Sequence, residues 1–240
     1  VIFSTYADLV ISALDREDAL DELAKPSRIP LINAEDVKGN PCQVLTDLMT
    51  IFERKGDLSG LKLAYLGDLN RGLASDLARV SCMMGIKMVA ANLFHTNISP
   101  TLKEAIENDC PRLVQGGPGE ARFTDDPLEA VTDADIIYTD AWMTFDSSES
   151  TDARFSEPVM NMQITENLMS RASQDAFFMH CLPCTGNTCE TAAAHIEGNE
   201  SIVFDQTYNR LHVQKALLLH LTRFGKFPPH EPENQRHRRD

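Results

Sequence analysis

The chain has 240 residues, of which 42% are hydrophobic, and this is enough to build a buried core without disulfides or metal. Its 22 Lys and Arg residues and 36 Asp and Glu residues give a net charge of −14, which disfavours nucleic acid and anionic membranes as partners. No apolar run approaches the roughly 20 residues of a membrane-spanning helix, and the first residues lack the layout of a signal peptide. These features predict a cytoplasmic protein.

The six cysteines are too few for a disulfide scaffold and lie in apolar segments, so free thiols are expected. Cys181 and Cys184 form a C-x-x-C, with Cys189, His180 and His195 nearby. This pattern is compatible with a zinc or redox site, but structural zinc sites usually show two well-spaced ligand pairs. The sequence therefore predicts no metal.

From Leu61 onward, short apolar runs alternate with amphipathic segments, which is typical of strands crossed by helices in a mainly parallel sheet. We therefore expect an α/β fold with an open, mainly parallel sheet and helices on both faces. The expected strands are Leu61–Leu66, Lys87–Ala91, Asp135–Asp140, Ala176–Cys181 and Ser201–Phe204. The expected helices lie near Ser75–Gly85, Pro100–Asn108, Pro127–Ala134, Met160–Ser173 and Thr191–Glu197.

The segments on either side of this sheet have a different pattern. A strand at Tyr6–Ala13, a helix at Arg16–Lys25 and a strand at Ile29–Asn33 are expected first, and they are too short to fold alone. Because Val1 already reads as part of a strand, the sequence is expected to be a fragment. Pro41–Lys55 has one apolar helical face and predicts a helix that bridges to the sheet. At the other end, an amphipathic helix is expected at Asn209–Phe224, followed by a disordered polar tail.

Three polar segments follow expected strands at their carboxyl ends, where open sheets bind ligands. Leu66–Gly72 lacks the G-x-G-x-x-G pattern, which disfavours a nicotinamide cofactor. Asp140–Asp146 contains the only tryptophan, so it either anchors a loop or binds a ligand through Asp140. Cys181 lies where a third strand ends. We expect Asn70, Asp140 and Cys181 to face one crevice.

Taken in order, these segments resemble the ornithine carbamoyltransferases. The matching segments are the Tyr6–Val10 strand, Asn40–Gln43 (the family's His-Pro-x-Gln), Gly67-Asp68 with Asn70 (Gly-Asp-x-Asn-Asn), Asp140 and Trp142 (Asp-x-Trp-x-Ser-Met-Gly), His180-Cys181-Leu182-Pro183 and Ile202–His212. The similarity covers about residues 1–224, and His-Cys-Leu-Pro favours ornithine over aspartate as the acceptor class.

The resemblance implies a two-lobed enzyme, generally a homotrimer, that transfers a carbamoyl group from carbamoyl phosphate to ornithine or a related amino acid in arginine and citrulline metabolism, without a cofactor. Residues 1–38 would be a remnant of the carbamoyl phosphate lobe, 39–208 the amino-acid domain, 209–224 a helix returning to the first lobe and 225–240 a tail. The family's phosphate-binding Ser-Thr-Arg-Thr does not occur in these 240 residues, so this fragment is expected to be inactive. The alternative is a catalytically silent member with an amino-acid-binding, regulatory or structural role.

The resemblance also implies residue roles. Gln43 would bind the carbamoyl amide, Asp140 and Cys181 would orient the amino group of ornithine, and Arg210 would lie near the developing oxyanion. The residues implied to bind substrate are Asn40, Asn70, Arg71, Thr144, Phe145 and Leu182, the last through its carbonyl and a candidate cis bond to Pro183.

Several of these positions depart from the family pattern. Asn40 stands in place of a histidine, Thr5 in place of an arginine and Arg71 in place of an asparagine, while Thr144-Phe145-Asp146 replaces Ser-Met-Gly. Asp146 adds a negative charge where an amino-acid carboxylate should bind, which is expected to move specificity away from ornithine.

Overall fold

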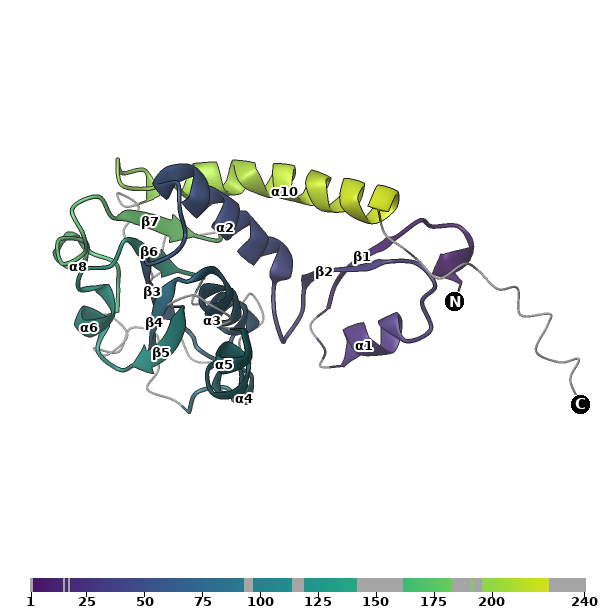
Figure 1. The fold of residues 1–240 in the computed structure, drawn as a ribbon, viewed down its shortest axis with the longest axis horizontal. Coiled ribbons are helices and arrows are strands. Elements are labelled where there is room, and N and C mark those ends of the chain that lie inside the picture. The colour runs from purple at the N-terminus through teal and green to yellow at the C-terminus, as the bar shows by residue number, and fades with distance from the viewer. Residues whose placement is uncertain are drawn as a thin grey trace, which may run out of the picture.

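The computed structural model describes residues 2–14, 16, 18–92, 97–113, 119–141, 162–182, 191 and 196–224, and Figure 1 shows their arrangement. A small N-terminal unit contains a two-stranded parallel sheet, and the rest of the chain forms a five-stranded sheet covered by helices. A long C-terminal helix extends from the larger sheet toward the N-terminal unit (Figure 1).

The N-terminal unit consists of a 3-10 turn (η1, Phe3–Thr5), β1 (Val10–Ala13), α1 (Ala19–Ala24) and β2 (Leu31–Glu35). The strand expected from Tyr6 begins only at Val10, because the preceding backbone forms turns: the amide of Ala7 donates to the carbonyl of Phe3 at 3.0 Å. The parallel pairing of β1 with β2 requires a crossover, which α1 provides.

The five-stranded sheet is entirely parallel, with the order β5-β4-β3-β6-β7. Its strands are β3 (Lys62–Gly67), β4 (Lys87–Asn92), β5 (Glu120–Thr124), β6 (Ile136–Thr139) and β7 (Phe177–His180). The chain builds outward from β3 to β5 and then returns to place β6 on the other side of β3. This reversal makes β3 and β6 a topological switch point, the usual ligand site of open α/β sheets.

The sheet is buried on both faces because alternate residues of each strand enter two different cores. On β3, Leu63 and Tyr65 pack into one cluster, whereas Ala64 and Leu66 pack into the other. The first cluster includes residues of α2 (Pro41–Lys55), α3 (Gly72–Met84), α4 (Pro100–Glu104) and a π-helical turn (η2, Ala105–Asp109). The second includes residues of α6 (Pro127–Val131) and α8 (Glu166–Met169). The predicted α/β fold with helices on both faces is confirmed.

Helix α2 has the bounds expected from the sequence, because its end signals are local. The side-chain oxygen of Asn40 accepts from the amide of Gln43 at 3.1 Å, and Pro41 occupies the first turn. Gly56 ends the helix with a φ of 78°. Helix α10 (Val203–Phe224) packs along α2, where the Asn209 amide donates to Thr50 Oγ1 at 3.1 Å.

The strand expected at Ser201–Phe204 is wrong. Ser201 makes only an isolated bridge with Phe178, and Val203 already begins α10, which therefore starts earlier than the expected Asn209. Ile202 and Val203 are buried while Phe204 is 61% exposed, as in the first turn of an amphipathic helix. Periodicity alone cannot separate so short an apolar run from a strand.

The expectation that all cysteines are free is also corrected. Cys82 of α3 and Cys110 of α5 (Cys110–Leu113) form a disulfide with their Cα atoms 5.4 Å apart. The pairing depends on the packing of α5 against α3, which sequence spacing did not reveal. Cys42 and Cys181 are free, while Cys184 and Cys189 lie outside the described residues.

The strand β5 was not predicted, and two of the predicted helices fall partly outside the described residues. The edge strand β5 is mostly exposed and carries Glu120 and Arg122, so it lacks the apolar pattern of the central strands. Of the helix expected at Met160–Ser173, only Glu166–Met169 (α8) is helical among the described residues, so this helix is much shorter than predicted. Most of the helix expected at Thr191–Glu197 lies outside the described residues, as does the tail at 225–240.

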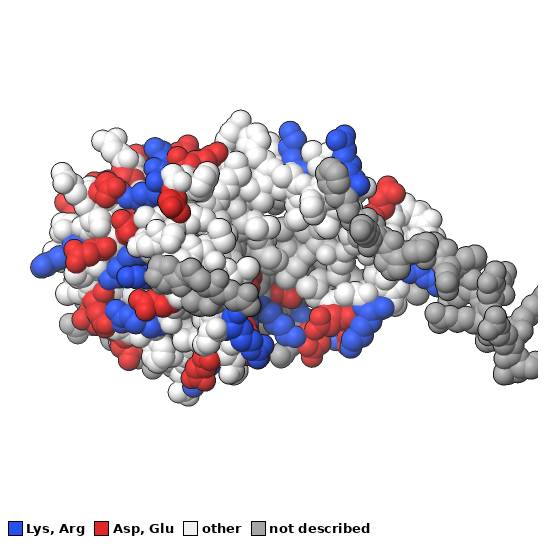
Figure 2. Space-filling model, viewed as in Figure 1, with Lys and Arg blue, Asp and Glu red and all other residues white. Residues whose placement is uncertain are grey.

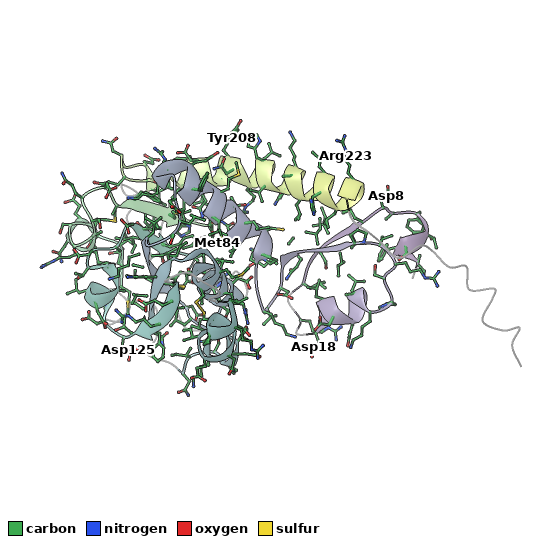
Figure 3. The ribbon with its side chains drawn as sticks, in the orientation of Figure 1. Asp8, Asp18, Met84, Asp125, Tyr208 and Arg223 are labelled. Carbon is green, nitrogen blue, oxygen red and sulfur yellow. A yellow bond between two sulfur atoms is a disulfide. The ribbon has the colours of Figure 1, made fainter. Side chains whose placement is uncertain are left out.

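In the face shown in Figure 2, charged side chains of both signs lie over the left part and along the lower edge, basic groups lie on the upper right edge, and the middle is a broad uncharged area. On α10, Tyr208 and Arg223 project outward from the helix (Figure 3). Within the described ranges, no helix is long and apolar enough to cross a membrane.

Candidate functional site

The candidate site lies at the carboxyl ends of β3, β6 and β7. The strand register places Leu66 beside Thr139, and Thr139 beside His180. Gly67, the last residue of β3, therefore lies level with Asp140 and Cys181, which follow β6 and β7. This geometry explains how three segments far apart in the sequence reach one edge of the sheet.

Gly67 makes room for the buried polar groups at the switch point. A Cβ atom at this position would lie 2.9 Å from the Tyr65 hydroxyl and 3.0 Å from Asp140 Oδ1, which are contacts that only displacement could relieve. Glycine is therefore required because of space, and it allows the Asp140 carboxylate to approach the end of β3.

Asp140 is a fully buried carboxylate whose charge partner is Arg71. Arg71 Nε lies 3.2 Å from Asp140 Oδ2. Burial raises the pKa of Asp140 to about 6, while Arg71 and His180 act in the opposite direction. Arg71 pairs with Oδ2, whereas Oδ1 has no hydrogen-bond partner within the described part of the chain, so Oδ1 is the oxygen that keeps capacity to bind a polar ligand group.

Arg71 connects the candidate site with the N-terminal unit. It precedes α3, and its Nη1 donates to the carbonyl of Ala141 at 2.8 Å. Its Nη2 lies 3.8 Å from a carboxylate oxygen of Glu35, at the end of β2. The neighbouring Asn70 is exposed, and its backbone amide donates to Asp68 Oδ1 at 2.9 Å, which shapes the loop.

Cys181 follows β7 and is held beside Arg210 of α10, whose Nη2 donates to the Cys181 carbonyl at 3.3 Å. Burial, followed by the negative charges of Asp140 and Asp47, raises the pKa of the Cys181 thiol to about 12. Cys181 is therefore a neutral thiol near neutral pH, suited to hydrogen bonding and packing and not to nucleophilic attack as a thiolate.

Leu182 has an unusual backbone conformation for its residue type. Its φ is 42°, a left-handed value that a branched side chain adopts at a cost of about 1–2 kcal/mol. Its amide donates to His180 Nδ1 at 2.9 Å, which holds the turn after β7. Strain of this kind clusters at functional sites, so it supports a ligand role for this turn.

Gln43 belongs to a buried polar network that the sequence analysis did not assign. Its amide nitrogen donates to Asp47 Oδ1 at 2.7 Å, while its Oε1 is buried without a partner in the described residues. Asp47 Oδ1 also accepts from Gln206 Nε2 at 2.6 Å, and Oδ2 accepts from the Tyr138 hydroxyl at 3.0 Å. The available signal was an aspartate four residues after Gln43, on the same helical face.

The structure brings together Arg71, Asp140, Cys181 and Arg210, and it connects Gln43 to the end of β7 through Asp47 and Gln206. Asn40 uses its side-chain oxygen to cap α2, which leaves its amide nitrogen as the donor for a ligand. Trp142, Thr144, Phe145, Asp146 and Pro183 lie outside the described residues. Among the described residues, no group of three or more His, Cys, Asp or Glu side chains could hold a metal ion. The substrate roles of all these residues stay predictions.

An open parallel sheet with polar groups converging at its switch point defines a small-ligand-binding α/β domain. Residues 59–221 match the family model for the Asp/Orn binding domain of aspartate/ornithine carbamoyltransferase. The chain therefore belongs to the aspartate/ornithine carbamoyltransferase family, as the sequence resemblance predicted.

Individual relatives agree with this assignment. An ornithine carbamoyltransferase of Listeria monocytogenes serotype 4b is 37% identical over 217 residues, covering 90% of this chain and 67% of the relative. One from Anoxybacillus flavithermus is 36% identical over 220 residues, covering 92% and 68%. The chain thus spans about two thirds of the length of these relatives.

Solved structures show the same similarity in three dimensions. The ornithine carbamoyltransferase from Pyrococcus furiosus superposes with a TM-score of 0.83 at 32% identity, covering 92% of this chain and 68% of that one. An N-acetyl-L-ornithine transcarbamylase superposes with a TM-score of 0.75 at 26% identity, covering 92% and 71%. Both free and N-acylated acceptors thus occur in the names of similar structures.

Proposed function

We propose that this chain provides the amino-acid side of a carbamoyl transfer site of the ornithine type. In this reaction a carbamoyl group moves from carbamoyl phosphate to an amino group of ornithine or a related amino acid. The observation that carries the proposal is the convergence of Asp140 and Cys181, which follow the neighbouring strands β6 and β7, with Arg210 of α10, which contacts the Cys181 carbonyl. Gln43 is linked to the end of β7 by the buried contacts of Asp47 and Gln206.

The chemistry requires a neutral amine to attack the carbonyl carbon of carbamoyl phosphate. A C–N bond forms, and the bond from carbon to the phosphate oxygen breaks with its electron pair going to the departing phosphate, which takes up the amine proton. Asp140 and Cys181 would orient the amine, and Asp140 with its pKa of about 6 is ionised at neutral pH. Arg210, beside the Cys181 carbonyl, would stabilise the developing oxyanion, and Gln43 Oε1 would accept from the carbamoyl amide.

The proposal extends to activity and assembly. The 240 residues contain no Ser-Thr-Arg-Thr, and losing several charge-assisted hydrogen bonds of about 1.5–3 kcal/mol each would reduce the rate by orders of magnitude. We therefore propose that this fragment binds an amino acid but turns over little or no substrate. A homotrimer and a role in arginine metabolism are proposed on the family resemblance. A cytoplasmic location is proposed on the sequence features described above.

Calorimetric titration of the purified chain with ornithine tests the binding half of this proposal. Ornithine should bind, and Asp140→Asn should weaken binding about tenfold or more, because the neutral amide of nearly the same shape removes a charge-assisted hydrogen bond. Asp126→Asn, at the exposed start of α6, is the matched control and should leave the affinity unchanged. Absence of ornithine binding at millimolar concentration would contradict the proposal.

A separate assay tests the proposed lack of turnover. The chain is incubated with ornithine and carbamoyl phosphate, and citrulline is measured against the uncatalysed background. Citrulline production at a rate typical of an intact enzyme, on the order of 10 turnovers per second or more, would refute this part.

A further inference from the structure

Asp47 lies between Gln43 of α2 and Gln206 of α10, and Gln206 in turn contacts the end of β7. It is fully buried on α2, one turn after Gln43. It joins α2 to β6 through Tyr138 and to α10 through Gln206, at distances of 3.0 and 2.6 Å. Besides burial, the groups that act on its charge are Gln206, Gln43, Tyr138 and Arg210, so its environment is defined by its own helix α2 together with β6 and α10.

The Asp47 carboxylate determines which way two side-chain amides point. Asp47 Oδ1 is the acceptor in both contacts, so Gln43 and Gln206 both direct their NH2 groups toward it. Their carbonyl oxygens then face away from it. Gln43 Oε1 remains buried without a partner in the described residues, and Gln206 Oε1 accepts from the amide of His180 at 3.0 Å.

Under the proposed function, the Gln43 and Gln206 contacts of Asp47 have a role on the side of each substrate. On the donor side, the fixed Gln43 amide presents an acceptor oxygen suited to an N–H group, such as that of a carbamoyl amide. On the acceptor side, the Gln206 contact holds His180, which is the last residue of β7 and directly precedes Cys181. Asp47 Oδ1 therefore orients both the Gln43 amide and, through Gln206, the end of β7.

A purely structural role explains this arrangement poorly. Burying a carboxylate costs free energy that a well-packed hydrophobic residue would avoid. Packing between α2 and α10 is already provided elsewhere, since Asn209 donates to Thr50 Oγ1 and to Glu53 Oε2 at 3.1 and 2.7 Å.

We propose that Asp47 is a positioning residue for carbamoyl transfer, whose Oδ1 orients the Gln43 amide for the donor and, through Gln206, the end of β7 for the acceptor amine. This inference rests on the proposed function for its substrate assignments, while the orientation of the two amides can be tested without any ligand.

The ligand-free test is NMR of the side-chain NH2 groups in the ¹⁵N-labelled chain. Gln43→Leu and Gln206→Leu assign the two signals by their disappearance. In the wild type both signals should be shifted by their hydrogen bonds and exchange slowly with solvent. Asp47→Asn keeps an oxygen that accepts from both amides, so both signals should stay shifted. In Asp47→Leu both hydrogen bonds are lost, so both signals should lose their shift and exchange faster with solvent. Asn209→Ala, which removes a different polar contact between the same helices, should leave both in place.

Ornithine affinity, measured by calorimetry on the same variants, tests the acceptor side. Asp47→Leu should weaken binding about tenfold, and Asp47→Asn and Asn209→Ala should stay within about twofold of the wild type. If Asp47→Leu does not fold, Gln206→Leu replaces it: the Gln43 signal should persist while ornithine affinity falls. The positioning role would be overturned if the two amide signals were unchanged in Asp47→Leu. It would also be overturned if Asp47→Leu and Asn209→Ala lost ornithine affinity equally. Failure of the wild type to bind ornithine would instead reject the proposed function and leave the NMR result standing.

Discussion

Arg71 is the residue at which this chain departs most informatively from the family pattern. Its guanidinium occupies the Asp140 carboxylate, which a substrate amine would otherwise approach. A ligand amine must therefore compete with Arg71 for Asp140, whereas a ligand carboxylate can use the guanidinium as a partner. Arg71 thus weakens the binding of a ligand amine and strengthens the binding of a ligand carboxylate, so it should influence which acceptor is preferred.

Arg71→Asn, which restores the asparagine of the family motif, should change relative affinity for two acceptors. Putrescine, which has two amines and no carboxylate, should bind about tenfold tighter because a repelling charge is removed. Ornithine should gain less, because its carboxylate loses a partner. Calorimetric titration of both ligands measures the ratio.

The control for this change is Arg122→Asn, which removes a charge from the exposed β5 edge, where Arg122 pairs with Glu129. It should leave the ornithine to putrescine ratio unchanged. If Arg71→Asn also leaves the ratio unchanged, Arg71 does not contribute to acceptor choice.

At the scale of elements, the start of α3 depends on a close backbone contact. A Cβ atom on Gly72 would lie 2.3 Å from the backbone nitrogen of Gly39, and backbone atoms there cannot yield as a flexible side chain could. Since Arg71 directly precedes Gly72, this contact sets the approach of α3 and of the Arg71 guanidinium to Asp140.

Gly72→Ala should therefore weaken ornithine binding as well as stability, the latter by about 1–3 kcal/mol. The matched variant is Gly60→Ala, where φ is 84° and the new methyl group meets no atom within 4 Å. It should cost a similar amount, about 1–2 kcal/mol, through backbone strain alone. Urea unfolding compares stabilities, and calorimetry compares affinities. Equal ornithine affinity in the two variants would show that the Gly72 contact does not position the site.

The accuracy of the sequence predictions followed how local the determining signals were. The bounds of α2 were predictable because its start and end are encoded by Asn40, Pro41 and Gly56. The strand ends carrying Asp140 and Cys181 were predictable because buried parallel strands are continuous apolar runs. By contrast, β5 is a polar edge strand, and the Asp47 network joins residues more than 150 positions apart, as in the Asp47–Gln206 contact with its separation of 159. Such contacts are created by packing, and no local pattern predicts them.

For the whole molecule, two fully buried carboxyl groups and a partly buried one give the free energy of unfolding a pH dependence of definite sign. Burial raises the pKa of Asp47 to about 7 and those of Asp76 and Asp140 to about 6, from an ordinary value of 3.8. The folded protein therefore binds these protons more tightly than the unfolded chain. Between about pH 4 and pH 7 the unfolded state carries fewer protons, so stability falls as pH rises through this window.

Other carboxyl groups act in the opposite direction but more weakly. Lys38 lowers the pKa of Asp18, Thr124 and Arg122 lower that of Glu129, and Lys55 lowers that of Asp175. These carboxyl groups are exposed, and solvent screens their ion pairs, so each contributes little to stability. The buried carboxyl groups should therefore decide the sign for the chain.

The chain is accordingly expected to be more stable near pH 5 than near pH 8, as measured by urea unfolding at both values. Asp47→Asn imitates the protonated form at every pH and should reduce the difference between the two values, mainly by raising stability at pH 8 relative to pH 5. Asp175→Asn, which removes an exposed carboxylate with a lowered pKa, should not reduce it. Stability that rises from pH 5 to pH 8, or an undiminished difference in Asp47→Asn, would mean that the buried carboxylates are stabilised by their hydrogen bonds more than burial penalises them. In that case the network around Asp47 would hold its charge without cost to the fold.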